Sequence, residues 1–175
     1  MLKNKDYHSA VPLCFIKKYI FKKANIEFVP DIYYEDSIFT YELFMIAQNA
    51  THCSEAFYHR RYRKSSIMTT KKNKKYFDSI CRVYEEVLAF SKKENKLHSE
   101  VAKKYIARCA FNVFNNYEKL NREDKNHCKK QLEKIKKSIL KDNAYGDKAL
   151  KMRCYGKIFW FIYKVYEKTV GRLFK

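Results

Sequence analysis

The second half of the chain, from residue 76 onward, places apolar residues at helical spacing in four successive stretches. Residues spaced i, i+3, i+4 and i+7 lie on one face of an α-helix, so these stretches predict amphipathic helices. We expect them at about residues 75–93, at about 99–120, in a third segment capped by Asn121, and at about 147–173. Only three Gly and two Pro are present to interrupt helices. Short polar loops between the stretches favour a small antiparallel bundle.

The residues expected to face the bundle core form one stripe on each of the first three helices. They are Phe77, Ile80, Tyr84, Val87 and Leu88, then Val101, Ile106, Cys109, Val113 and Phe114, then Cys128, Leu132, Ile135 and Ile139. The fourth helix differs, because the run Ile158–Tyr163 is apolar on all sides. That run is far shorter than the roughly 20 residues that span a bilayer. With lysines around it, it fits either the central helix of the bundle or a helix lying on an anionic membrane surface.

The formal net charge of the chain is +19, and it is concentrated in the second half. Residues 73–175 carry twenty-six Lys and Arg against twelve Asp and Glu. Such a charge attracts nucleic acid, anionic membrane or phosphorylated ligands, although a solvated lysine-rich surface gives the same composition. No helix-turn-helix, RNA-recognition or zinc-finger signature accompanies it.

The six cysteines have no zinc-ligand spacing, so we expect no metal site and reduced, buried thiols. No signal-peptide pattern is visible in the sequence. We therefore expect a cytoplasmic protein, with peripheral contact at the inner face of the membrane as an option.

The first part of the chain has a more mixed pattern. A short amphipathic helix with Pro12 in its first turn is followed by the alternating, strand-like piece Ile26–Val29. Asp36 or Ser37 then fits the N-cap of a helix that fades near Ala50. An extended basic and aromatic segment runs from Cys53 to Arg63. The charged run KKNKK at 71–75 is the best candidate for a domain boundary.

Taken in order, four pieces of residues 10–70 resemble the C-terminal part of the catalytic domain of family-two, inverting, GT-A-type glycosyltransferases. They are the basic helix and short strand of Phe15–Asp31, the tyrosine-rich Glu-Asp motif IYYEDSIF at 32–39, the helix to Ala50, and FYHRRYRKSSIM at 57–68. Two positions depart from the family pattern. Arg60 stands where the family usually has an aromatic residue, and Ser65 stands where it prefers glycine.

The resemblance implies a fold and a set of roles. The fold would be mainly α with minor β: a truncated C-terminal part of a GT-A α/β domain at residues 1–72, then a basic helical bundle at 73–175. Asp36 would be the general base that takes the proton of the acceptor hydroxyl, with Glu35 binding or orienting the acceptor. The residues that would contact the nucleotide diphosphate are His59, Arg61, Arg63 and Ser66.

The resemblance also implies parts that this sequence does not supply. In the family, an N-terminal α/β half binds the nucleotide sugar, and its D-x-D motif holds Mg²⁺ or Mn²⁺ on the diphosphate. No D-x-D occurs in the chain. We therefore expect a truncated product, one half of a split enzyme or an excised fragment, inactive alone. The alternative function is a non-enzymatic basic helical module that binds nucleic acid or an anionic membrane surface.

Overall fold

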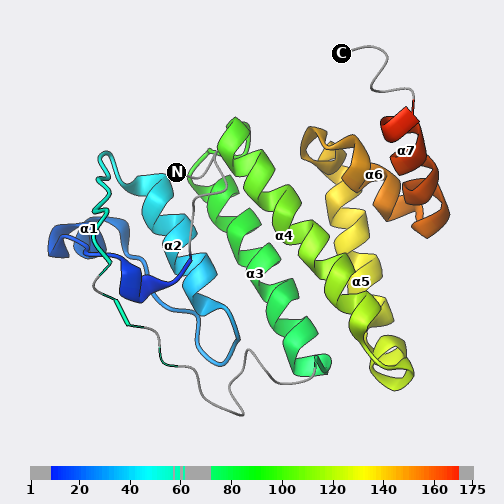
Figure 1. Cartoon of the computed structure of the whole chain (residues 1–175), viewed down its shortest axis with the longest axis horizontal. Coiled ribbons are helices and arrows are strands. Elements are labelled where there is room, and N and C mark those ends of the chain that lie inside the picture. Colours follow the sequence, from blue (N-terminus) through cyan, green and yellow to red (C-terminus); the bar gives the residue numbers. More distant parts are fainter. Residues whose placement is uncertain (1–8, 57, 60, 62–71, 170–175) are drawn as a thin grey trace.

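The computed structural model describes residues 9–56, 58–59, 61 and 72–169. Its elements are, in order, the 3-10 turn η1 (Val11–Leu13), α1 (Lys18–Ala24), α2 (Glu35–Ile46), α3 (Lys74–Lys93), α4 (Glu100–Lys119), α5 (Arg122–Lys141), the 3-10 turn η2 (Asn143–Gly146), α6 (Lys148–Tyr155) and α7 (Lys157–Thr169). Figure 1 shows α2, α3 and α4 side by side, with α1 beyond α2 and with α5, α6 and α7 on the other side. The prediction of a mainly helical protein is confirmed.

Polar caps begin the four helices α3, α4, α5 and α6. The side-chain oxygens of Asn73, Ser99, Asn121 and Asp147 each accept a hydrogen bond from the backbone N–H three residues later, at 3.0, 3.2, 2.8 and 2.8 Å. Each bond satisfies an N–H that has no partner inside the helix. The predicted cap at Asn121 is confirmed, and local sequence sets where these helices begin.

The predicted stripes form the core of the bundle. Every residue expected there is buried except Val101, which is half-buried. Two hydrogen-bonded hydroxyl pairs lie inside this core: Tyr41 with Ser91, and Tyr84 with Tyr145, both at 2.7 Å between oxygens. Because a buried hydroxyl without a partner is costly, these pairs also fix how the helices meet.

Helix α2 joins the bundle to the N-terminal layer. Ile38 and Tyr41 are part of the same core as α3 and α4. On its other side, Phe39 and Leu43 pack with Ile26 and with half-buried residues of η1 and α1. The predicted division at residues 72 and 73 therefore falls between two helices, α2 and α3, that share one core.

Two predicted extended pieces form no strand among the described residues. Residues 26–29 lie in the loop between α1 and α2, and the described part of 53–63 is exposed and without regular structure. A strand needs a neighbouring strand to pair its backbone groups, and the described chain offers none beside either piece. The minor β content expected from the resemblance is absent from the described residues.

The last predicted helix is two helices, broken at Gly156. This glycine has φ 134° and ψ 172°, a conformation that L side chains rarely adopt. The interpretation of Ile158–Tyr163 as the central helix of the bundle is wrong, because α7 has no buried residue and the side chain of Ile158 is 74% exposed. Within the described part of the chain, no helix has the length and apolar character needed to cross a membrane.

Candidate active site

The chain enters α2 through a turn that is attached to the start of α3. Asp31 and Tyr34 have positive φ angles of 60° and 68°, which are uncommon for residues other than glycine. The backbone N–H of Tyr33 donates a hydrogen bond to Ser79 Oγ at 3.1 Å. The rings of Tyr33 and Tyr34 lie 5.9 and 5.3 Å from the ring of Tyr76, between centroids. These contacts hold the acidic pair that follows against the bundle.

Glu35 and Asp36 occupy the first turn of α2. The prediction that Asp36 or Ser37 is the N-cap was wrong: the N-cap is Tyr34, in a left-handed conformation and without a capping side chain. Instead, the Tyr34 carbonyl accepts a hydrogen bond from the Ser37 N–H at 2.9 Å. Both carboxyl groups therefore lie at the start of the helix, near the N–H groups that have no partner inside it.

The Asp36 carboxyl is half-buried, and its pKa is raised above the ordinary value of 3.8. Burial is the largest cause, because it penalises the charged form, and the adjacent charge of Glu35 adds to it. Hydrogen bonds from Ser37 act in the opposite direction. A carboxyl group with a raised pKa holds a proton more readily, which is what a general base requires.

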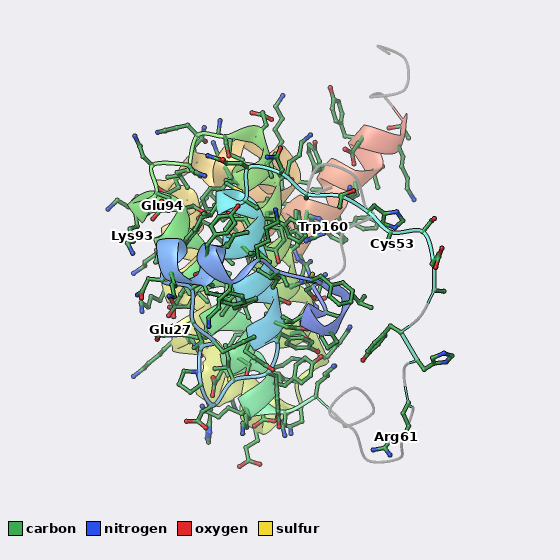
Figure 2. The ribbon with its side chains drawn as sticks, turned by 90° about the vertical axis from the view of Figure 1, so that its left-hand side faces the viewer. Glu27, Cys53, Arg61, Lys93, Glu94 and Trp160 are labelled. Atoms are coloured by element: carbon green, nitrogen blue, oxygen red, sulfur yellow. The ribbon has the colours of Figure 1, made fainter. Side chains whose placement is uncertain are left out.

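The structure does not bring the predicted diphosphate contacts to this pair. His59 and Arg61 are exposed on the segment that follows α2. Figure 2 shows Arg61 well away from the helices. No hydrogen bond or ion pair joins either residue to Glu35 or Asp36 among the described residues. Arg63 and Ser66 lie outside the described residues. Contact with the nucleotide diphosphate stays a prediction for all four residues.

One acidic residue with an unusual environment, Glu42, was missed by the sequence analysis. Its pKa is raised from 4.5 to about 7, first by burial and then by the charges of Glu86 and Glu94, against the opposing charge of Lys93. Helical spacing places Glu42 seven residues after Glu35, on the same face of α2, and Asp36 about 100° around the helix. That spacing was visible in the sequence. The closeness of Glu86 and Glu94 to Glu42 could not be read from the sequence.

A hollow of about 320 Å³ lies elsewhere, between α4, α5 and the junction of α6 with α7. Phe114, Glu118, Lys125 and Arg153 are among its lining residues. The Arg153 side chain is buried there and forms an ion pair with Glu118. The hollow shares no lining residue with the acidic pair of α2, and we assign no chemistry to it.

The described residues offer no group of three His, Cys, Asp or Glu side chains that could hold a metal ion. Together with the lack of a D-x-D motif in the sequence, this does not fit the Mg²⁺ or Mn²⁺ that the resemblance implies. No chemical step is therefore assigned to a metal held by this chain.

Comparisons of the chain with models of protein families, with curated proteins and with solved structures found no match.

Proposed function

We propose that this chain is the acceptor-side part of an inverting glycosyltransferase that uses a nucleotide-sugar donor, with Asp36 as general base and Glu35 orienting the acceptor. The observation that carries the proposal is the half-buried Asp36 carboxyl, whose pKa is raised by burial and by Glu35 in the first turn of α2. The ordered likeness of residues 10–70 to that enzyme family supports the same assignment.

In the proposed reaction the acceptor hydroxyl oxygen attacks the anomeric carbon of the donor sugar. The hydroxyl proton passes to the Asp36 carboxylate as the new bond forms. The bond from the anomeric carbon to the diphosphate oxygen breaks, and the nucleotide diphosphate leaves with the electron pair. His59, Arg61, Arg63 and Ser66 are proposed to offset the charge of that leaving group.

The proposal assigns the donor sugar and its metal ion to a separate α/β unit. The N-terminal layer has apolar side chains available for such a unit: Leu13, Tyr19 and Phe28 are 47%, 61% and 49% exposed. Apolar surface of this kind is a common feature of protein–protein contacts. On this proposal the chain alone binds nucleotide sugars weakly or not at all and turns over none.

Acceptor binding by the full chain tests the proposal directly. An array of glycans should reveal an acceptor that the chain retains and that Glu35→Gln weakens. Asp31→Asn is the matched control, because Asp31 is exposed in the preceding loop and asparagine tolerates its positive φ. Failure to retain any glycan, or equal retention by the two variants, would contradict the assignment of Glu35.

Calorimetry with a panel of nucleotide sugars and Mn²⁺ tests the assignment of the donor site to a separate unit. We expect little heat and no product. Turnover by the chain alone would contradict the assignment of the donor site to another unit. If a donor-binding unit restores turnover, Asp36→Asn should abolish it while Asp31→Asn leaves it unchanged, since only Asp36 is proposed to accept the proton.

A stripe of lysines on α5 favours a second candidate, a basic helical module that binds nucleic acid. Lys130, Lys134, Lys137 and Lys141 are exposed and recur at i, i+4, i+7 and i+11 on the side opposite the buried residues of α5. One of them, Lys134, forms an ion pair with Glu85, at 3.3 Å between Nζ and Oε1. Binding through this stripe would weaken steeply with salt, because each neutralised phosphate releases counterions. Fluorescence anisotropy of a labelled DNA duplex distinguishes this candidate from the first. It compares duplex binding by the natural chain with binding by a variant that has glutamine at these four lysine positions.

A further inference from the structure

Helix α7 has an uncovered apolar face. Six of its side chains on that face are exposed, by 46% to 74%: Ile158, Phe159, Phe161, Ile162, Val165 and Tyr166. Their spacing of three and four residues places them along one broad side of the helix. Six exposed apolar side chains that lie together on one helix are typical of an interaction site rather than of scattered surface residues.

The opposite side of α7 is attached to the rest of the protein. The ring of Trp160 lies 4.6 Å from the guanidinium carbon of Arg153, whose side chain is buried. Lys157 Nζ approaches Glu118 of α4 at 3.5 Å. Among the described elements, only α6 brings its backbone close to α7. In Figure 1, α7 lies at the end of the molecule, beside α6. The apolar face is therefore directed away from the bundle.

The charges of α7 show what kind of partner fits this face. Lys157, Lys164 and Lys168 lie along one edge of the apolar side, and Glu167 is the only acidic residue in the helix. Lys164 is paired with Glu167 at 2.7 Å and Lys157 with Glu118 at 3.5 Å, and the Lys168 side chain is exposed. Apolar side chains bordered by cations match the acyl region and the anionic headgroups of a membrane surface.

Other partners fit less well. A second copy of the chain would bring a further net charge of +19, and like charge opposes self-association. Nucleic acid binds through phosphates, which the exposed aliphatic and aromatic groups of α7 cannot contact favourably. The thirteen residues of α7 span about 20 Å, too short to cross a bilayer of about 30 Å but sufficient to lie on one.

We propose that α7 docks the protein on anionic membrane surfaces, with its apolar face in the interface and its lysines at the headgroups. This proposal does not depend on the proposed glycosyltransferase function. It requires neither the acidic pair of α2 nor a donor-binding unit, so either proposal can fail alone.

Co-sedimentation of the full chain with vesicles tests it. We expect binding to phosphatidylcholine vesicles that contain about 30 mol% phosphatidylglycerol, and much weaker binding to phosphatidylcholine alone. The double variant Phe161→Ser, Ile162→Ser should lower the apparent affinity at least about tenfold. The matched control is Leu13→Ser, Tyr19→Ser, which removes exposed apolar side chains of η1 and α1 and should change nothing. Figure 1 shows α1 and α7 at opposite ends of the molecule.

Charge and orientation give two further readouts. Lys164→Gln with Lys168→Gln should weaken binding about tenfold, and added salt should weaken binding further. Trp160 is the only tryptophan of the chain and faces α6. Bromine-labelled lipid should therefore quench its fluorescence less than that of the variant Trp160→Phe, Phe161→Trp, whose indole lies on the apolar face. Equal quenching would contradict the proposed orientation.

Several outcomes would overturn the proposal. These are a lack of binding to anionic vesicles, equal binding to neutral vesicles, and undiminished binding by the α7 serine variant. If that variant instead abolished a dimer seen by sedimentation velocity, or nucleic-acid binding, the apolar face would serve one of those partners and not a membrane. Circular dichroism and the thermal midpoint should be unchanged in the serine variant, because the residues that it replaces are exposed.

Discussion

Helices α5 and α7 both carry apolar residues at helical spacing, yet the protein uses them differently. In α5 the apolar residues form a narrow stripe, Cys128, Leu132, Ile135 and Ile139, and all are buried. In α7 they cover most of the circumference, and none of its residues is buried. A narrow stripe can be covered completely by neighbouring helices, whereas the broader apolar side of α7 needs more neighbours to cover it. Within the described structure, only α6 brings its backbone close to α7. An apolar sequence thus predicts a helix, but not its burial.

The same substitution in the two helices provides the largest expected contrast. Ile139 is fully buried in α5, and Ile162 is 59% exposed in α7. Ile139→Ala should lower the free energy of unfolding by about 2–5 kcal/mol, because it leaves a cavity in a packed core. Ile162→Ala should change it by less than about 0.5 kcal/mol. Urea denaturation followed by circular dichroism measures both. Similar losses in the two variants would contradict the comparison.

The second prediction concerns the attachment of α7 to the bundle. Glu118→Gln should cost about 2 kcal/mol, since it leaves the buried Arg153 guanidinium without its carboxylate partner. The matched control is Glu133→Gln in α5. Glu133 pairs with Lys136 at 2.7 Å on the surface, and an exposed pair contributes about 0–1 kcal/mol. Thermal unfolding of the two variants should separate them clearly, and an equal effect would mean that the buried pair contributes no more than the exposed one.

The third prediction tests what begins α5. Asn121→Ala should destabilise the protein by about 1 kcal/mol, because the N–H of Asp124 loses its capping oxygen. Asn126→Ala, an exposed position inside the same helix, makes the identical change of side chain without affecting a cap. It should be neutral or stabilise by a few tenths of a kcal/mol, because alanine favours helix. Chemical denaturation of both variants gives the comparison, and equal losses would exclude capping as the cause.

The last prediction extends the comparison from apolar to ionisable side chains, and its effect depends on pH. The pKa of Glu42 is raised from 4.5 to about 7 in the folded protein. The folded state therefore holds this proton more tightly than the unfolded state. The stability it contributes is fully present below pH 4.5 and is lost as the pH rises through about 7. Above that pH the Glu42 carboxylate opposes folding.

Glu42→Gln should consequently be more stable than the natural protein at pH 8, by about 1 kcal/mol after allowance for the half-exposed position, and similar to it near pH 4. Stability measured across this pH range checks the sign. Glu27→Gln is a suitable control, because Glu27 is exposed in the loop before α2. A stability gain that is independent of pH would rule out ionisation of Glu42 as its origin.

The bundle was predictable from the sequence because its signals are local. A cap such as Asn121 and the stripe behind it sit within a few turns of one helix. The position of Asp36 in the first turn of α2 was predicted to within two residues. The N-cap of α2 was not predicted: it is Tyr34, which has a left-handed conformation and whose ring packs against Tyr76, a residue far away in the sequence.

The parts that were not predicted depend on neighbours. The raised pKa of Glu42 arises from burial and from Glu86 and Glu94, which follow more than forty residues later. The exposure of α7 likewise depends on what packs beside it. Its break at Gly156 was visible as a residue type, but one glycine inside a helical pattern indicates a break only weakly.

The break at Gly156 also separates local motions from the global unfolding of the protein. The glycine N–H donates to the Met152 carbonyl, and its own carbonyl accepts from the Trp160 N–H, so the two hydrogen-bond ladders meet at this residue alone. Because α7 contributes no buried side chain, it can open while the core stays closed. Its amide hydrogens should exchange with deuterated water far sooner than those of α5, and any surface that covers α7 should slow them.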